Sequence, residues 1–175
     1  MEVVAKLSTS HGKMAAQECP CGFFSDPKKE CTCSSSAVTR YQKRVSGPLL
    51  DRIDVFVEVP PVAYEKLVDE APAQDSSHAR KRVQQARDIQ RERFKDNGFL
   101  CNSEMGPAEV WKSCPLDESA KALLQAATQR LNLSARAFHR ILKVSRTIAD
   151  LDAAKDIGVA HLAEALQYRS RGFTG

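Results

Sequence analysis

The stretch that decides the fold is residues 133–151, with the sequence LSARAFHRILKVSRTIADL. Its apolar and small residues recur every three or four positions, which places them on one face of an α-helix. Ser134 stands just before this run, where its hydroxyl oxygen can accept a hydrogen bond from an amide of the first turn. The pattern predicts a capped helix with one buried face, made of Phe138, Ile141, Leu142, Ser145 and Ile148.

Helical patterns also lie on both sides of this stretch. Asp117 is a second N-cap residue ahead of an apolar stripe, and Pro107 suits the first turn of a short helix that ends near Cys114. Residues 77–95 are charged and contain no glycine. Because each stripe needs a partner to cover it, we expect an all-α helical domain over residues 77–172. The further stripes are Leu116, Ala120, Leu123, Leu124, Ala127 and Leu131, and then Val159, Leu162, Ala163 and Leu166.

Upstream of the helical domain the pattern changes. Residues 37–45 are compatible with a helix, and a Ser-Gly-Pro cluster and a short turn then lead into residues 53–59, where β-branched residues alternate as in a strand. The predicted fold class is therefore α+β: a segment with a helix, a turn and a strand, over residues 15–62, precedes the helical domain. Residues 63–76 are assigned as a linker and residues 1–14 as a leader without an assigned structure.

Composition limits what the chain can do. Its 175 residues are 42% hydrophobic, which is enough for a packed core, and 26 basic against 22 acidic side chains give a net charge of +4. A charge this small does not by itself indicate a nucleic-acid partner. No apolar run is long enough to cross a bilayer and the N-terminus lacks a secretory signal pattern, so we expect a cytoplasmic protein without a membrane partner.

The six cysteines of such a protein should stay reduced. Four of them form two close pairs in the loop of residues 19–33, and four thiolates around one ion would suit a structural, tetrahedral zinc. The single residue between the members of each pair is a tighter spacing than structural zinc sites usually have, so free thiols are the alternative. The candidate metal ligands are Cys19, Cys21, Cys31 and Cys33.

The segment from Arg80 to Lys95 holds seven basic residues and only two acidic ones. Such a density of positive charge can bind a phosphate backbone. The alternative is a solvated helix face, or a face docked on a neighbouring subunit. Phe94 alone offers little for base stacking. The candidate nucleic-acid-binding residues are Arg80, Lys81, Arg82, Arg87 and Arg91.

Five blocks of sequence resemble one family. They are CPCG at residues 19–22, SGPLLDRID at 46–54, LSARA at 133–137, RTIADL at 146–151 and HLAEALQYR at 161–169. In order and spacing they resemble the magnesium-chelatase-like AAA+ ATPases, and within these the competence-associated branch-migration helicase type (ComM or YifB). The resemblance implies that the complete protein is an ATP-driven hexameric ring, with ATP and Mg²⁺ as its cofactors and with DNA as a candidate partner. It also implies that residues 15–62 are the remnant of an AAA+ α/β core and that residues 77–172 are its helical lid.

The resemblance gives roles to two arginines. Arg52 stands just before the predicted strand, where related ATPases present an arginine finger to the γ-phosphate in the neighbouring subunit. Arg136, at the start of the capped helix, matches the sensor-2 arginine, which contacts the nucleotide of its own subunit. A guanidinium suits both places because it is planar, permanently charged and able to make forked hydrogen bonds to phosphate. The alternative for each is an ordinary surface salt bridge.

Parts of the motor are absent from the sequence. It contains no phosphate-binding loop of the G-x-x-x-x-G-K-[ST] type and no apolar strand that ends in Mg²⁺-binding acidic residues. The sensor-1 asparagine of the family is also absent, and either Gln17 or Glu18 stands in its place, depending on the alignment. We therefore expect a piece of a longer ATPase, which supplies the arginine finger and sensor 2 and does not hydrolyse ATP alone.

Two other functions are compatible with the sequence. The chain could be a non-catalytic helical module that binds nucleic acid or protein, in which case adding an upstream motor half would not restore ATP hydrolysis. It could instead handle metal, either by binding zinc in the cysteine loop or as a subunit associated with a chelatase. Metal content and ATP hydrolysis distinguish these functions from the motor.

Overall fold

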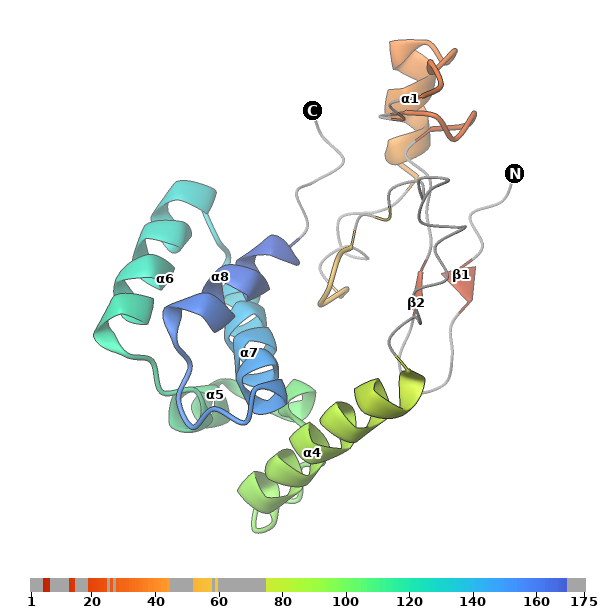
Figure 1. Cartoon of the computed structure of the whole chain (residues 1–175). Coiled ribbons are helices and arrows are strands. Elements are labelled where there is room, and N and C mark those ends of the chain that lie inside the picture. Colours follow the sequence, from red (N-terminus) through yellow and green to blue (C-terminus); the bar gives the residue numbers. More distant parts are fainter. Residues whose placement is uncertain are drawn as a thin grey trace. The chain divides into compact units, whose positions relative to one another are not determined.

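Figure 1 shows the computed structural model of the chain. The structure describes residues 5–6, 13–14, 19–24, 26, 28–44, 52–57, 59 and 75–169. The chain divides into two compact units: one holds the two strands and α1, and the other holds the remaining helices. The described elements are β1 (Ala5–Lys6), β2 (Lys13–Met14), α1 (Ser35–Gln42), α4 (Ser76–Phe94), the 3-10 turn η1 (Asn102–Glu104), α5 (Pro107–Ser113), α6 (Glu118–Leu131), α7 (Ala135–Leu151) and α8 (Val159–Gln167).

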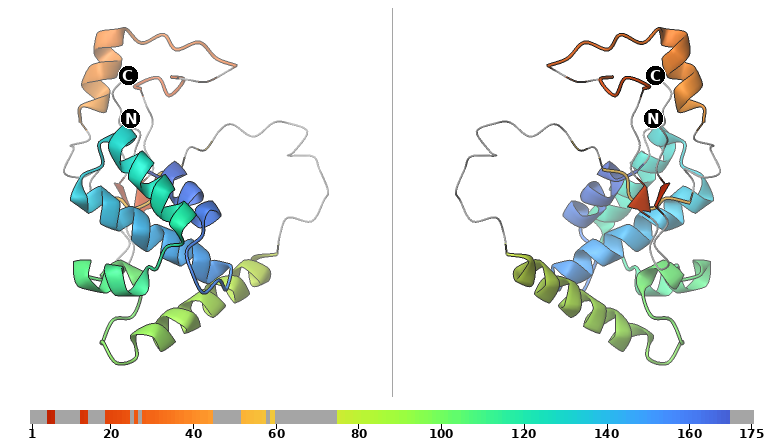
Figure 2. Two further views of the ribbon diagram at one scale, coloured as in Figure 1. Left: turned by 90° about the vertical axis from the view of Figure 1, so that its left-hand side faces the viewer. Right: turned by 90° about the vertical axis from the view of Figure 1, so that its right-hand side faces the viewer.

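Helix α7 is the centre of the helical domain. Helices α4, α5 and α8 pack on it, and α6 packs on α8 (Figures 1 and 2). The predicted apolar face of α7 is buried, with Ile141 3% and Leu142 1% exposed. Ser145 is fully buried on the same face, and its hydroxyl donates a hydrogen bond to the carbonyl of Ile141 within the helix. The sequence prediction of a helix with one buried face is confirmed.

The helices begin and end as their local chemistry predicts. Ser134 Oγ accepts a hydrogen bond from the amide of Ala137 at 3.2 Å. Asp117 Oδ1 accepts one from the amide of Ala120 at 2.6 Å. Each bond satisfies one of the amides that a helix start leaves without a partner. Helix α6 ends where Asn132 adopts a left-handed backbone with φ 47°, a conformation that asparagine tolerates better than most residues.

One apolar cluster joins the helices of this domain. Its residues come from α4, α5, α6, α7 and α8. Detachment of any of these helices would therefore expose buried apolar surface to water. Phe94 of α4 packs edge to face on Phe99, with the ring centroids 5.8 Å apart. None of the described helices has the length and apolar character needed to cross a membrane. The buried members of the cluster are Phe94, Met105, Val110, Cys114, Ala120, Leu124, Ile141, Leu142, Ile148, Ala149, Ile157, Leu162 and Ala165.

The predicted strand over residues 53–59 does not form in the part of the chain that the structure describes. The described residues of this segment belong to no sheet, and the amide of Phe56 instead donates a hydrogen bond to the carbonyl of Tyr168 at 2.9 Å. Val55 and Val57 are 47% and 65% exposed. A strand is stabilised by neighbouring strands that take up its backbone hydrogen bonds, and alternation alone does not provide them. The strand prediction was therefore wrong, and the described residues do not show the remnant of an α/β core.

The other unit contains α1 and the cysteine loop before it. Ser34 caps α1, because its Oγ accepts a hydrogen bond from the amide of Ala37 at 3.3 Å. The prediction of a helix here is confirmed, although α1 begins two residues earlier than expected. Among the side chains of this unit that the structure describes, only those of Cys19 and Val38 are buried. This unit therefore has almost no apolar core in its described part.

Several predictions concern residues outside the described ones. They include the sensor-1 position at Gln17 or Glu18, the turn up to Asp51, and the linker up to residue 74. Within the predicted leader, β1 and β2 form a short antiparallel pair in which Lys6 lies opposite Lys13. Residues 170–172, at the end of the predicted helical domain, also lie outside the described part.

Candidate functional site

The loop ahead of α1 gathers four thiols into one cluster. The Sγ atoms of Cys19, Cys21 and Cys31 lie 3.3 to 3.7 Å apart, and all four Sγ atoms, including that of Cys33, lie within 4.8 Å of one another. In a tetrahedral site, metal–sulfur bonds of about 2.3 Å place the sulfurs about 3.8 Å apart. The sulfurs of a disulfide would be only about 2 Å apart. The cluster therefore has the dimensions of a four-thiolate metal site.

Tight turns in the loop bring the two cysteine pairs together. Gly22 has φ 80°, a backbone conformation that favours glycine, and its amide donates a hydrogen bond to the carbonyl of Cys19 at 3.1 Å. Asp26 Oδ1 accepts hydrogen bonds from the amides of Lys28 and Lys29 at 2.7 and 3.2 Å, which reverses the chain before the second pair. The loop thus depends on turns and thiols, since it has little apolar surface to bury.

The cluster favours one thiolate, that of Cys21. Hydrogen bonds from the backbone of Phe23 and from the thiol of Cys19 lower the pKa of Cys21 to about 6. At Cys31 the backbone hydrogen bond of Cys33 acts in the same direction, but burial and the hydrogen bonds with Cys21 and Cys19 outweigh it and raise the pKa to about 12. Thiolate is the form of cysteine that ligates metals. The remaining two cysteines belong to the helical domain and have other surroundings: burial raises the pKa of Cys114 to about 11, and Cys101 lies beside the hydroxyl of Ser103. The cysteines of the loop therefore form a distinct chemical group.

The two arginines that the resemblance assigns to nucleotide lie in different units. Arg136 is the second residue of α7, is exposed, and stands on the first turn that Ser134 caps. Arg52 lies in a turn and is exposed as well. Both arginines are therefore exposed residues, and their roles at a nucleotide stay predictions.

The five candidate nucleic-acid-binding residues are all exposed on α4. Two of them have acidic partners: Arg82 Nη2 lies 3.5 Å from Asp152 Oδ1, and Arg91 Nη1 lies 2.9 Å from Asp88 Oδ1. These pairs are exposed to solvent and weak. The other three form no ion pair with any residue that the structure describes; they are Arg80, Lys81 and Arg87.

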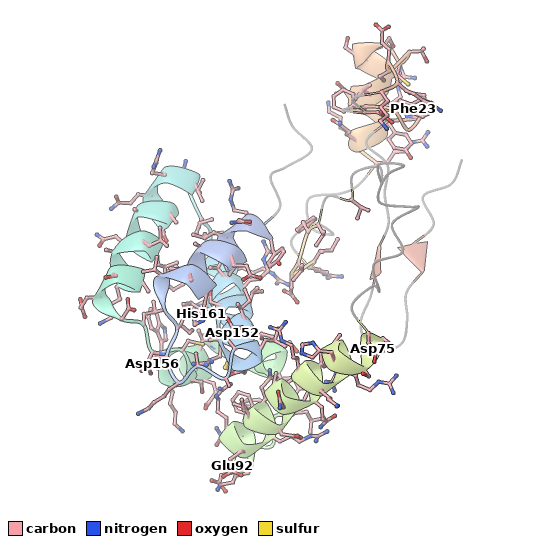
Figure 3. The ribbon with its side chains drawn as sticks, in the orientation of Figure 1. Phe23, Asp75, Glu92, Asp152, Asp156 and His161 are labelled. Carbon is pink, nitrogen blue, oxygen red and sulfur yellow. The ribbon has the colours of Figure 1, made fainter. Side chains whose placement is uncertain are left out.

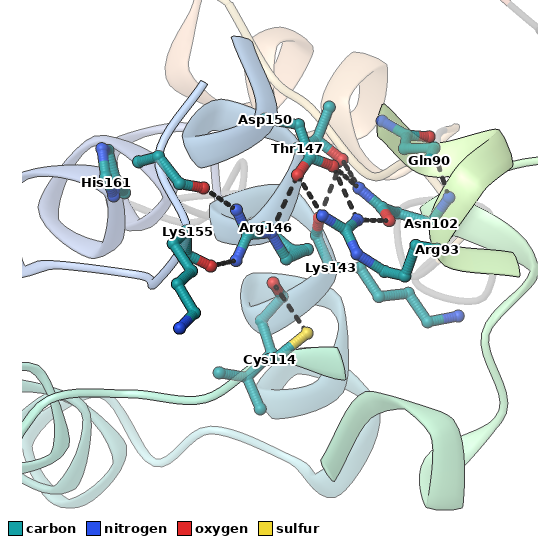
Figure 4. A network of polar contacts seen from close by, with 12 residues as sticks. Gln90, Arg93, Asn102, Cys114, Lys143, Arg146, Thr147, Asp150, Lys155 and His161 are labelled. Carbon is teal, nitrogen blue, oxygen red and sulfur yellow. Dashed lines mark hydrogen bonds and ion pairs between the residues drawn. The ribbon is translucent and has the colours of Figure 1, made fainter. Parts of the chain in front are cut away.

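The structure also contains a buried ionic network that the sequence reasoning missed (Figure 4). Arg146 and Asp150 are each 1% exposed, and Arg146 Nε donates a hydrogen bond to Asp150 Oδ1 at 3.0 Å. The terminal nitrogens of Arg146 donate to the carbonyls of Lys155 and Ala154 at 2.8 and 2.6 Å. This guanidinium therefore holds the loop after α7 against the helix.

Arg93 connects α4 to the same network. Its guanidinium donates to both carboxylate oxygens of Asp150 and to Oδ1 of Asn102. Asn102 Nδ2 in turn donates to Asp150 Oδ2 at 2.8 Å and to Thr147 Oγ1 at 3.0 Å. The buried carboxylate thus has two cations and an amide around it, which is what a buried charge requires. The network fastens α4, η1 and α7 to one another.

The sequence did contain a signal for this network. Arg146 and Asp150 are four residues apart, so they lie on the same face of α7 and can meet. That face also carries the buried Leu142 and Ala149. Because charged side chains are almost never buried unless they are paired, such a pair in an apolar stripe predicts an internal salt bridge.

The fold and the site define a small all-α domain preceded by a loop of clustered cysteines. The family described as Magnesium chelatase, subunit ChlI C-terminal, matches residues 73–169, and the family described as Magnesium chelatase, subunit ChlI, matches residues 11–67. The chain belongs to the magnesium chelatase ChlI family.

Curated relatives narrow the position within the family. The chain is 43% identical over 139 residues to Competence protein ComM of Haemophilus influenzae. The matched stretch covers 78% of this chain and 26% of that protein. It is 36% identical over 154 residues to the uncharacterized protein YifB of Escherichia coli, covering 86% of this chain and 29% of the relative. It is 32% identical over 159 residues to the uncharacterized protein Rv2897c of Mycobacterium tuberculosis, covering 91% of this chain and 31% of the relative. The resemblance to the ComM and YifB type is confirmed, and the chain spans less than a third of each of these relatives.

Proposed function

We propose that this chain is the C-terminal, lid-bearing part of an ATP-driven AAA+ motor that works on branched DNA as a hexameric ring. The observation that carries the proposal is Arg136, which is exposed on the first turn of α7 within the block that resembles a sensor-2 motif. Membership of the ChlI family and the similarity to a competence protein support it.

The helix that carries Arg136 is fixed near both ends. Ser134 holds its first turn, and the hydrogen bonds of Asp150 with Arg93 of α4 and with Asn102 of η1 anchor its second half. Helices α4, α5 and α8 pack on α7, so a force applied at Arg136 acts on the whole domain. If Arg136 binds the γ-phosphate, the loss of that phosphate releases the domain as one body, and hydrolysis is coupled to movement.

Arg52 would complete the nucleotide site of the neighbouring subunit. An arginine finger stabilises the charge that develops on the transferred phosphoryl group and is worth about 10³- to 10⁵-fold in kcat. The exposed position of Arg52 in a turn suits a side chain that has to cross a subunit interface. Hydrolysis would then depend on ring assembly, because each site needs a guanidinium from the next subunit.

ATP and Mg²⁺ belong to the complete motor. The guanidinium groups of Arg52 and Arg136 fit a triphosphate because of their charge and planar geometry. Mg²⁺ prefers oxygen ligands, whereas the one group of three or more candidate metal ligands in the described residues is the set of four thiols. In the proposed motor, the phosphate-binding loop and the Mg²⁺ ligands come from the upstream part, and this chain alone does not hydrolyse ATP.

A chimera tests the proposal. The upstream part of ComM from H. influenzae, joined to this chain, should hydrolyse ATP and move a DNA branch point. Arg52→Ala in the chimera should lower ATP turnover by about 10³-fold or more and leave nucleotide affinity nearly unchanged, because the finger acts across the interface. Arg136→Ala should weaken nucleotide binding, because it acts within its own subunit. Turnover and the binding of a fluorescent ATP analogue measure the two effects.

Two matched variants serve as controls in the chimera. Arg40→Ala removes an exposed arginine from α1, and Arg130→Ala removes one from α6. Both should leave turnover and nucleotide affinity unchanged. A folded chimera without ATP hydrolysis would favour the non-catalytic binding module. Equal losses of binding and turnover in Arg52→Ala would contradict a role in the neighbouring site.

A second candidate function, the binding of a structural zinc ion, is favoured by the thiol cluster. Four protein thiolates complete a tetrahedral site and leave no open position for chemistry, which indicates a structural role. The described part of residues 19–44 buries only Cys19 and Val38. A bound ion would therefore supply stabilisation that an apolar core does not provide.

Metal analysis tests the zinc proposal directly. The purified chain should carry one zinc ion per molecule, and cobalt in its place should give a thiolate-to-metal charge-transfer band. Cys19→Ser and Cys33→Ser should lose both the metal and the band. Cys101→Ser, which changes a cysteine of the helical domain, should keep both. A zinc-supplemented preparation that holds no metal would leave free thiols as the correct description of the loop.

A further inference from the structure

Helix α4 has two halves with different surroundings. In its second half, Ala86, Gln90 and Phe94 are buried against the domain. In its first half, every residue from 76 to 85 is exposed. Figures 1 and 2 show the first turns of α4 extending beyond the bundle formed with α7. We call residues 76–87 the basic arm.

The basic arm is positively charged along its whole length. It contains four arginine or lysine residues and no acidic residue, and the nearest carboxylate before it belongs to the N-cap Asp75. Asp75 is engaged in the cap, where it accepts hydrogen bonds from the amide and the hydroxyl of Ser77. The first acidic residue after the arm is Asp88, and it already accepts hydrogen bonds from Arg91 and Gln84. Figure 3 shows Asp75 at one end of α4 and Glu92 near the other.

Three of the four cations in the arm are available to a partner. Arg82 turns back toward Asp152 on the domain, at 3.5 Å. Arg80, Lys81 and Arg87 make no ion pair with any residue that the structure describes. An α-helix turns by about 100° and rises about 1.5 Å per residue, so Arg80 and Arg87 share one stripe about 10 Å apart, with Lys81 beside it. All three side chains are exposed: Arg80 and Arg87 lie at the border of the buried side of α4, on the stripe that continues to Phe94, and Lys81 lies on the opposite side.

We propose that the basic arm binds the phosphate backbone of a nucleic acid through Arg80, Lys81 and Arg87. A docking site for protein would need an apolar or aromatic centre. The arm offers only Val83, which is 48% exposed, and no Phe, Tyr or Trp. Without aromatic rings it cannot provide a stacking platform for bases, so it recognises the backbone and not the sequence. The inference that this nucleic acid is DNA rests on the proposed DNA motor.

Binding of a labelled duplex to the full chain tests the arm. With three phosphate contacts, affinity should fall about 40-fold between 50 and 200 mM salt, which corresponds to a log–log slope near −2.7. The variant with Arg80→Gln, Lys81→Gln and Arg87→Gln should bind at least about tenfold more weakly at the lower salt concentration and show a nearly flat salt dependence. Glutamine preserves helix propensity, and circular dichroism checks that α4 still forms.

A charge-matched control makes the test specific. Lys112→Gln, Lys121→Gln and Arg130→Gln together remove the same three charges from exposed positions on α5 and α6. This variant should keep the affinity of the parent chain within about threefold and keep its salt slope. Equal weakening in both variants would overturn the proposal, since net charge alone would then account for the binding. Unchanged binding in the arm variant would overturn it as well.

Two further outcomes distinguish DNA binding by the arm from self-association and from the motor activity. If light scattering shows that the arm variant loses self-association while its affinity for DNA is unchanged, the arm is a contact between copies of the chain and the proposal fails. In the chimera, Arg52→Ala should lose ATP hydrolysis and keep DNA affinity, whereas the arm variant should lose DNA affinity and keep basal hydrolysis. An inactive chimera whose DNA affinity still depends on the arm would refute the motor and leave the arm in place.

Discussion

The helical domain and the cysteine loop are stabilised by different means. The helical domain buries thirteen residues in one apolar cluster and pairs its buried charges within the chain. The described part of residues 19–44 buries Cys19 and Val38, and its four thiols share one small space. A domain with enough apolar area can fold by burial alone, whereas a short segment without a core needs a cross-link or an ion.

This contrast predicts that the two regions respond separately to perturbation. Removal of the proposed zinc ion should affect the loop and leave the helices unchanged. A change in the buried network should affect the helices and leave the proposed zinc ion bound. The difference also follows the proposed roles, since a domain that moves as one body has to hold together throughout the nucleotide cycle.

Removal of the proposed zinc ion should have the largest effect, and it should be confined to the loop. Structural zinc contributes its binding energy to folding, so chelation should unfold residues 19–44. Cleavage by a lysine-specific protease after the exposed Lys28 and Lys29 should become at least about tenfold faster, because proteolysis follows the population of the open form. Cleavage after Lys121 in α6 is the internal reference and should not change. A uniform increase at all sites would contradict the separation of the two regions.

Loss of the buried carboxylate should have the next largest effect, in the helical domain. Asp150→Asn leaves Arg146 buried without a counter-charge and weakens the contact with Arg93, which should lower the free energy of unfolding by about 3–5 kcal/mol. Urea denaturation followed by circular dichroism measures this change. The zinc content of the chain should not change.

Asp152→Asn is the matched control for that substitution. Its side chain is 51% exposed, and its contacts with Arg82 and with His161 Nε2, both at 3.5 Å, are long and worth at most about 1 kcal/mol each. If both variants unfold at the same urea concentration as the parent chain, the buried network does not stabilise the domain. If Asp150→Asn does not fold at all, Arg93→Gln removes one of the two cations and should give a smaller, measurable loss.

The sequence predicted the features that depend on nearby residues. The helices and the caps at Ser134 and Asp117 follow from local spacing, and the cysteine spacing singled out the thiols that lie together. The network was missed because Asp150 takes its partners from three separate segments, although its spacing from Arg146 was a usable signal. The strand was predicted wrongly because strand formation depends on distant partners. Side-chain alternation does not reveal whether they are present.

Removal of the cap on α7 should have a smaller effect on stability. It should also weaken the proposed contact between Arg136 and nucleotide. Ser134→Ala deletes the oxygen that accepts from Ala137 and should cost about 1 kcal/mol in the free energy of unfolding. Because the cap fixes the first turn, the chimera with this substitution should also bind nucleotide more weakly, in the same direction as Arg136→Ala. Ser134→Asp retains a capping oxygen and should restore stability. Full stability in Ser134→Ala would contradict the cap.

The smallest effect should come from a single backbone angle at the end of α7, and it should be stabilising. Ala153 has φ 52°, a conformation that costs a residue with a side chain about 1–2 kcal/mol. Ala153→Gly removes that strain but adds freedom to the unfolded chain, so the net gain should be about 0.5 kcal/mol. The same substitution at the exposed Ala122, inside α6, should instead cost about 1 kcal/mol. Urea denaturation of the two variants should therefore shift in opposite directions, and two shifts of the same sign would contradict the strained turn at Ala153.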